Sequence, residues 1–117
     1  MTREYAMNLV NRAAVILWPL PPLITWINQR DRDFELTLEQ LREEPTAYLL
    51  SDFAADNMEE ELQRVYQVIW LEQLRGYYKN ARLPRRRSYE DFLEWFEPQL
   101  LSMVVDTEGA PLLREPL

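Results

Sequence analysis

The segment Ala13–Trp18, AAVILW, is continuously apolar, contains two β-branched residues and is followed by Pro19. A run of this length is short for a buried helix and matches a strand that is covered on both faces. Further on, Pro21 or Pro22 suits the first turn of a helix, because the N–H group that proline lacks would have no partner there. The sequence therefore predicts a buried strand over residues 13–18 and a helix that runs to about Gln29.

Two other segments have the composition of strands. Thr46–Ser51, TAYLLS, stops at Asp52, and Leu101–Val105, LSMVV, leads into a predicted turn at residues 107–109. Together with the segment at 13–18 they predict a sheet of three strands.

Capping residues mark two of the remaining helices. Thr37 and Gln40 have the spacing of a capping box, in which each side chain binds an N–H group that the first helical turn leaves unpaired. The longest helix is predicted over about residues 58–79, with Asp56 or Asn57 as its N-cap.

The last predicted helix starts at Ser88, has Asp91 three residues later, and ends near Glu97 because Pro98 follows. The predicted order is therefore β-α-α-β-α-α-β. Since strands alternate with pairs of helices, we expect an α+β domain, a small three-stranded sheet with about four helices packed on it.

The length of 117 residues corresponds to one domain. We expect residues 1–9 to be an N-terminal arm, helical or frayed, and residues 10–108 to form the single α+β domain. Residues 109–117 are expected to be a loosely held C-terminal tail. Met7 is an alternative translation start to Met1.

Several residue types that enzymes commonly use are absent or scarce. The chain has no His and no Cys, which excludes the usual serine and cysteine triads, disulfides and ordinary zinc sites. Two glycines are too few for a phosphate-binding loop or a dinucleotide fingerprint. Carboxylates cluster at residues 59–61 and 90–94, but at predicted helix starts, where they offset the helix dipole. We expect no enzymatic activity, no metal and no cofactor, with a carboxylate-based metal-dependent enzyme as the enzymatic alternative.

The charge of the chain is unevenly distributed. The net charge is −7, yet residues 79–87 contain five basic residues and no acid, which leaves eight basic against twenty acidic residues elsewhere, a net charge of −12. An acidic chain repels nucleic acid and anionic membranes, so we do not expect nucleic acid to be the main partner. Prolines interrupt the apolar stretch at 13–27, so we expect no membrane segment and a cytoplasmic location. Nucleic-acid or phosphate binding through the basic loop Arg82–Arg87 is the alternative function.

Aromatic residues are numerous for this length, with four Trp, six Tyr and four Phe. Some are adjacent on predicted helices, as Trp95 and Phe96 are, and adjacent helical residues cannot both face one core. Either a second element of the domain covers them, or they form a surface for a partner or a second copy. The candidate partner-binding residues are Arg85, Arg86, Arg87, Trp18, Trp70, Tyr78 and Trp95.

The sequence resembles a family of small acidic bacterial proteins with no assigned function. The resemblance lies in residues 11–16, 22–28, 37–41, 46–50, 92–96 and 102–106. It implies no activity, cofactor or site residue. Two segments depart from the family pattern, Trp18–Pro21 and Arg85–Arg87.

These observations favour a non-enzymatic interaction domain, which binds a protein partner or associates with itself. The expected docking surface is aromatic and is rimmed by the loop Arg85–Arg87.

Overall fold

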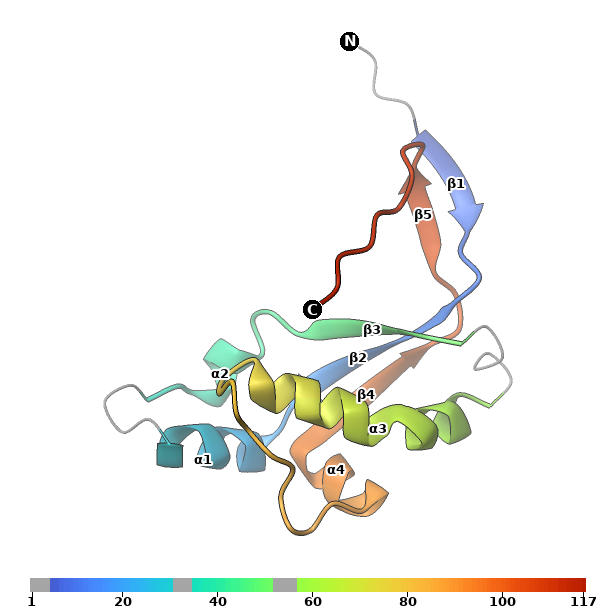
Figure 1. Ribbon diagram of the computed structural model, residues 1–117. Helices are drawn as coiled ribbons and strands as arrows, with labels where there is room; N and C mark the ends of the chain where they lie inside the picture. The colour runs from blue at the N-terminus through green and yellow to red at the C-terminus, as the bar shows by residue number, and fades with distance from the viewer. Residues whose placement is uncertain (1–4, 31–34, 52–56) are drawn as a thin grey trace.

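The computed structural model describes residues 5–30, 35–51 and 57–117 (Figure 1). It is an α+β fold with two sheets. Its elements, in chain order, are β1 (Tyr5–Leu9), β2 (Ala13–Pro19), α1 (Pro21–Arg30), α2 (Leu38–Leu41), β3 (Thr46–Leu50), α3 (Met58–Arg75), α4 (Tyr89–Trp95), β4 (Phe96–Leu101) and β5 (Val105–Glu108).

The larger sheet has three strands in the order β3-β2-β4, with both pairs antiparallel. The predicted apolar strand is its centre, since Val15 of β2 lies opposite Tyr48 of β3 and Leu100 of β4. A central strand has a neighbouring strand along each edge and is the strand that the rest of the domain covers most completely. This explains why the most apolar segment takes this place.

One face of this sheet is covered by helices. Ala13, Val15 and Leu17 of β2 are buried and belong to the same core as side chains from α1, α3 and α4. Figure 1 shows α1, α3 and α4 gathered along this side of the sheet. The largest fully buried side chains of the core are Trp70, Phe92, Phe96, Leu17, Leu23, Leu62, Leu74 and Val15. Each contributes roughly 1.5–3 kcal/mol through burial of apolar surface.

The opposite face of the sheet is only partly covered. Trp18 is half-buried there, and its indole Nε1 donates a hydrogen bond to Oε1 of Gln99 at 3.0 Å. The guanidinium of Arg42 lies 5.7 Å from the centre of the Trp18 ring and pairs with Glu97 at 3.6 Å. Polar neighbours therefore cover Trp18 on this face.

The prediction of a single three-stranded sheet was wrong, because the chain also forms a two-stranded sheet of β1 and β5. The third strand was predicted at 101–105, but β4 starts at Phe96 and β5 starts at Val105. Phe96 has extended backbone angles, and its side chain is buried opposite Pro19, which draws the chain into the sheet five residues early. Pro98 does not prevent this, because β4 is an edge strand.

The N-terminal segment was predicted to be helical or frayed, yet Tyr5–Leu9 is a strand that pairs antiparallel with β5. Residues 107 and 108, predicted as a turn, belong to β5. No described residue has a positive φ, so Gly109 is not in the conformation that only glycine adopts easily. A short strand whose partner lies about a hundred residues away has no local signal beyond its composition.

The local capping predictions were confirmed for two helices. Capping boxes are present at Thr37 with Gln40 and at Ser88 with Asp91. Asn57 stands at the N-cap of α3 without a side-chain hydrogen bond, and the alternative cap Asp56 lies outside the described residues. Along the described ranges, no helix combines the length and the hydrophobicity needed to cross a bilayer.

Candidate protein-docking groove

The basic loop between α3 and α4 is held at both ends, although it has no regular secondary structure. At its start, Ala81 is buried, its N–H donates to the carbonyl of Tyr78 at 3.0 Å, and its own carbonyl accepts a bond from Nε of Arg75 at 3.3 Å. At its end, the hydroxyl of Tyr66 donates to the carbonyl of Arg87 at 2.7 Å. These contacts give the arginines between them a defined position on the surface.

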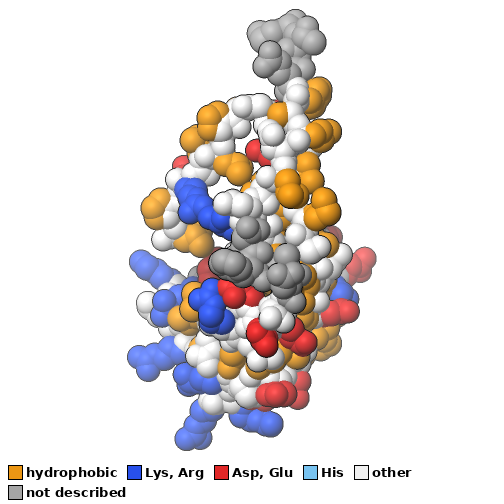
Figure 2. All heavy atoms as spheres, turned by 90° about the vertical axis from the view of Figure 1, so that its right-hand side faces the viewer, with side chains coloured by type: hydrophobic (Ala, Val, Ile, Leu, Met, Phe, Trp, Pro, Cys, Tyr) orange, Lys and Arg blue, Asp and Glu red, His pale blue; other side chains and the backbone are white. Residues whose placement is uncertain are grey.

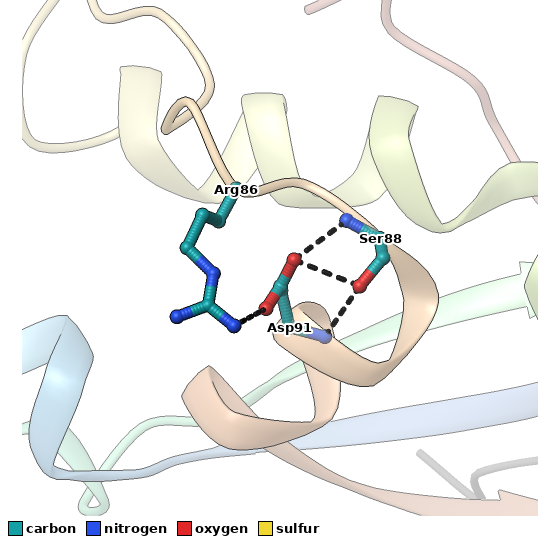
Figure 3. Close-up of polar contacts among 3 residues, drawn as sticks. All are labelled: Arg86, Ser88 and Asp91. Atoms are coloured by element: carbon teal, nitrogen blue, oxygen red, sulfur yellow. Dashed lines mark hydrogen bonds and ion pairs between the residues drawn. The ribbon is translucent and has the colours of Figure 1, made fainter.

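The first turn of α4 fixes one arginine of this loop (Figure 3). Oδ2 of Asp91 accepts bonds from the backbone N–H and the hydroxyl of Ser88, at 3.0 and 2.7 Å, and the N–H of Asp91 donates back to that hydroxyl at 3.1 Å. Nη2 of Arg86 lies 3.6 Å from Oδ1 of Asp91. The Ser88 side chain, the Ser88 backbone and the Arg86 charge lower the pKa of Asp91, so the carboxylate is ionised over the neutral range.

Most of the basic loop has no such partner. Within the described residues, Arg86 is the member of the loop that forms an ion pair, and none is formed by Arg82, Arg85 or Arg87. Ion pairing with acidic residues of the protein's own helices is the simplest explanation of the loop's positive charge, and it accounts for one arginine, Arg86. The side chains of Arg82, Arg85 and Arg87 are exposed, and no acidic side chain among the described residues pairs with them.

Trp95 stands between two surface hollows. The first, of about 430 Å³, is lined by Pro21, Pro22, Thr25, Trp26, Gln29 and Trp95. The second, of about 320 Å³, is lined by Pro84, Arg85, Arg86, Asp91, Glu94 and Trp95. Trp95 is the residue that the two hollows share, and we call the pair of hollows the Trp95 groove, which is apolar toward α1 and charged toward the basic loop.

Packing within the domain holds the two tryptophans of the groove in place. The Trp95 ring contacts the buried Trp70 ring at a centroid distance of 5.4 Å, and the carbonyl of Trp95 accepts a bond from the N–H of Leu20 at 2.9 Å. The Trp26 ring packs edge-on against Tyr78 at 5.6 Å, and the guanidinium of Arg30 lies 4.0 Å from its centre. Contacts within the domain thus hold both tryptophan side chains in place, and side chains that are already ordered lower the entropic cost of binding a ligand.

The seven predicted partner-binding residues are only partly brought together. Arg85, Arg86 and Trp95 line the groove, and Tyr78 supports it through Trp26. The Arg87 side chain is exposed but does not line the groove. Trp18 lies on the other face of the sheet, and it is not part of this site.

The prediction that Trp70 forms part of a docking surface was wrong, because its side chain is fully buried. Its ring contacts Phe92 and Trp95 of α4, so another element of the domain covers it, which is one of the two alternatives that the sequence left open. Sequence reasoning in turn missed Trp26 and Thr25 as lining residues. A signal was present, because Pro22 and Trp26 are four residues apart and so share one helical face.

The acidic clusters do not form a metal centre in the part of the chain that the structure describes, since no three potential ligands there are grouped closely enough. Glu61 is engaged by the Arg64 side chain, whose hydrogen bond lowers the pKa of this carboxyl. Asp106 accepts a hydrogen bond from the N–H of Glu108 at 2.9 Å, and Asn28 binds the backbone N–H and carbonyl of Leu36, both at 3.0 Å. The side chains of Asp106 and Asn28 therefore bind backbone groups, and that of Glu61 binds an arginine.

Comparison with known protein families, with curated proteins and with solved structures found no match for this chain. The resemblance to small acidic bacterial proteins of unassigned function stays a prediction.

Proposed function

We propose that this protein is a non-enzymatic interaction domain that binds a short acidic segment of a partner protein in the Trp95 groove. The single observation that carries the proposal is the position of Trp95, which joins an apolar hollow to one lined by Arg85 and Arg86. A peptide with an apolar residue next to a carboxylate fits both halves of this groove, and aromatic and arginine side chains are the residues that most often dominate binding energy.

The charge pattern limits the length of the acidic segment. Arg82, Arg85 and Arg87 form no ion pair with any described residue, so they attract an anion that reaches the loop. Apart from residues 79–87, the chain has a net charge of −12. Charges are screened over about 10 Å at moderate ionic strength, so a carboxylate or two at the groove feel mainly the loop. A long polyanion such as RNA extends over the acidic surface and is repelled, which favours a peptide over nucleic acid.

The tryptophans provide a direct test. We would screen labelled peptides of about twelve residues, with Asp or Glu flanking Leu or Pro, and follow the four indole N–H signals by NMR. The expected result is that the signals of Trp26 and Trp95 shift on titration while that of Trp18, on the other sheet face, does not. A shift confined to Trp18, or binding of a single-stranded oligonucleotide but of no peptide, would contradict the proposal.

A matched pair of variants sharpens this test. Arg85→Glu reverses a charge in the groove and Arg87→Glu makes the same change just outside it, with no ion pair lost in the described part of the chain. A charged hydrogen bond contributes about 1.5–3 kcal/mol, so Arg85→Glu should weaken the best peptide at least about tenfold and Arg87→Glu only a few-fold. Equal losses would place the binding site elsewhere.

A third variant should act in the opposite direction. Glu94 lines the charged half of the groove and forms no ion pair with any described residue. Glu94→Gln removes a carboxylate that repels the ligand, so we expect affinity for the acidic peptide to rise a few-fold, measured by fluorescence polarisation. Unchanged or weaker binding would argue against an acidic ligand.

A further inference from the structure

The two-stranded sheet extends the main sheet instead of forming a separate layer. Leu9 of β1 lies opposite Val105, and Ala14 of β2 lies opposite Leu101. Between these pairs the N–H of Val10 donates to the carbonyl of Val104 at 2.8 Å, so β1-β2 and β5-β4 form one long ribbon. Four residues of one strand lie opposite three of the other between these pairs, and the register also shifts between Tyr5 and Asn8. Such irregularities bend a ribbon. We call residues 5–10 and 102–108 the arm.

The arm extends beyond the elements that cover the rest of the ribbon. β3 ends at Leu50, opposite Ala13, so within the described residues no third strand accompanies the arm. In Figure 1 the arm rises away from the helices. The radius of gyration is 16.5 Å and the longest dimension 49 Å, whereas a compact chain of this length has a radius of gyration of about 13 Å. Two strands alone are marginally stable in water.

The surface of the arm is apolar. Its large exposed hydrophobic side chains, with exposed fractions from 47% to 75%, are Tyr5, Met7, Leu9, Met103 and Val105. Figure 2 shows hydrophobic side chains following the arm, with charged side chains concentrated below it. Together the five expose on the order of 600 Å², against the ~800 Å² that each partner contributes to a standard specific interface.

The two edges of the arm differ in charge. β1, YAMNL, has no charged residue and no proline, two of the devices that protect an edge strand from pairing with another chain, although its register with β5 shifts between Tyr5 and Asn8. β5, VDTE, contains Asp106 and Glu108. In a chain with a net charge of −7, these carboxylates oppose contact with a second β5 edge or with an anionic lipid surface. The β1 edge is therefore the one suited to pairing.

We propose that the arm is a self-association surface, in which β1 of one copy pairs antiparallel with β1 of a second copy about a two-fold axis. Such an axis brings the same patch of both copies together, as closed symmetric dimers require. It places Met7 opposite Met7 of the second copy and Leu9 opposite Tyr5, and it leaves Asp106 and Glu108 of both copies on the outer edges. Self-association through β1 does not depend on peptide binding at the Trp95 groove, so each proposal can be tested without the other.

The absence of cysteine allows a specific cross-linking test. The proposed two-fold axis passes through Met7, the central residue of β1, and so places Met7 opposite its copy. Residues paired across antiparallel strands have Cα atoms about 4.5–5.5 Å apart, within the range that a disulfide spans. Met7→Cys should therefore oxidise to a covalent dimer at least about tenfold faster than Leu113→Cys, an exposed control in the tail. Equal oxidation rates of the two variants would overturn the proposal. A dimer in which the copies exchange β1 would overturn it as well, because that arrangement does not place Met7 opposite Met7.

Sedimentation of the unmodified chain over a range of concentrations provides the second measurement. We expect a concentration-dependent dimer that Leu9→Lys weakens at least about tenfold. The matched control is Val68→Lys, which places the same charge on an equally exposed apolar position of α3 and should leave the dimer unchanged. A strictly monomeric unmodified chain, or an equal effect of both variants, would overturn the proposal. If Leu9→Lys alters the circular dichroism spectrum, the cysteine comparison decides.

Discussion

β1 and β2 are consecutive strands of one ribbon, yet their surroundings are opposite. Most of β2 is buried between β3, β4 and the helices, whereas four of the five residues of β1 are exposed. Both strands contain large apolar side chains, so composition alone does not explain the difference. A strand becomes core only where other elements of the chain reach it, and within the described residues β3 and the helices stop short of the arm.

The largest expected effect lies in the covered part of the molecule. Phe92 is fully buried, and its ring contacts Tyr66, Trp70 and Phe96. Phe92→Ala removes these contacts and leaves a cavity, so it should lower the free energy of unfolding by about 3–5 kcal/mol in urea titrations. A loss below about 1 kcal/mol would show that the helices do not cover the sheet as described.

The next effect concerns the edge at which α3 holds β3. The hydroxyl of Tyr48 donates to Glu72 and accepts a bond from Nε2 of Gln73 at 2.8 Å. Tyr48→Phe should cost about 1.5–3 kcal/mol, because it removes a hydrogen bond to a charged group. An unchanged unfolding midpoint would mean that this bond does not hold β3 in place.

The same residue predicts a dependence on alkaline pH. Burial, and then the hydrogen bond to Glu72, raise the pKa of Tyr48 above its ordinary value. The stability that Tyr48 contributes is therefore fully present below the unfolded pKa of about 10 and is lost as the pH rises through the folded pKa. Tyr48→Phe should reduce the loss of stability between pH 9 and the alkaline limit of folding, and an identical profile for both proteins would contradict this assignment.

A smaller effect is expected at the start of α4. Ser88→Ala removes an N-cap side chain and should cost about 1 kcal/mol in thermal or urea unfolding.

The neighbouring Asp91 predicts a dependence on acid pH. Because the hydrogen bonds of Ser88 lower the pKa of Asp91, the stability that this carboxylate contributes is present above its unfolded pKa of about 3.9 and is lost as the pH falls through the folded value. The difference in the free energy of unfolding between the unmodified chain and Asp91→Asn should therefore decrease at acid pH. A difference that does not change with pH would exclude a stabilising role of the ionised Asp91.

The smallest effect on stability should be found in the arm. Leu9 is mostly exposed, so Leu9→Ala should change the free energy of unfolding by less than about 0.5 kcal/mol at low protein concentration. A larger loss under monomeric conditions would show that the arm is already packed within one chain.

Local features of the fold were predictable from the sequence, because the interactions that create them span few residues. The capping boxes at Thr37 and Ser88 and the strand that became β2 are of this kind. The pairing of Tyr5 with Glu108 was not predictable, since it depends on how the whole chain folds. The start of β4 at Phe96 was missed for the same reason. Pro98 suggests the end of a structural element, but an edge strand tolerates proline, and the place of β4 at the sheet edge depends on the whole fold.

The candidate site shows the same limit. The arginine loop was identified from its charge, which is a local property. Its apolar neighbour Trp26 was not, because α1 and α4 are more than fifty residues apart and their contact is tertiary. Trp70 was misassigned to the surface because its position on α3 does not show that α4 covers it.

The contrast between the two halves of the ribbon is tested most directly by amide hydrogen exchange at low and high protein concentration. We expect the amides of β2 to be strongly protected at both concentrations, and the protection of β1 to rise with concentration as second copies cover it. Equal and concentration-independent protection of β1 and β2 would contradict this expectation.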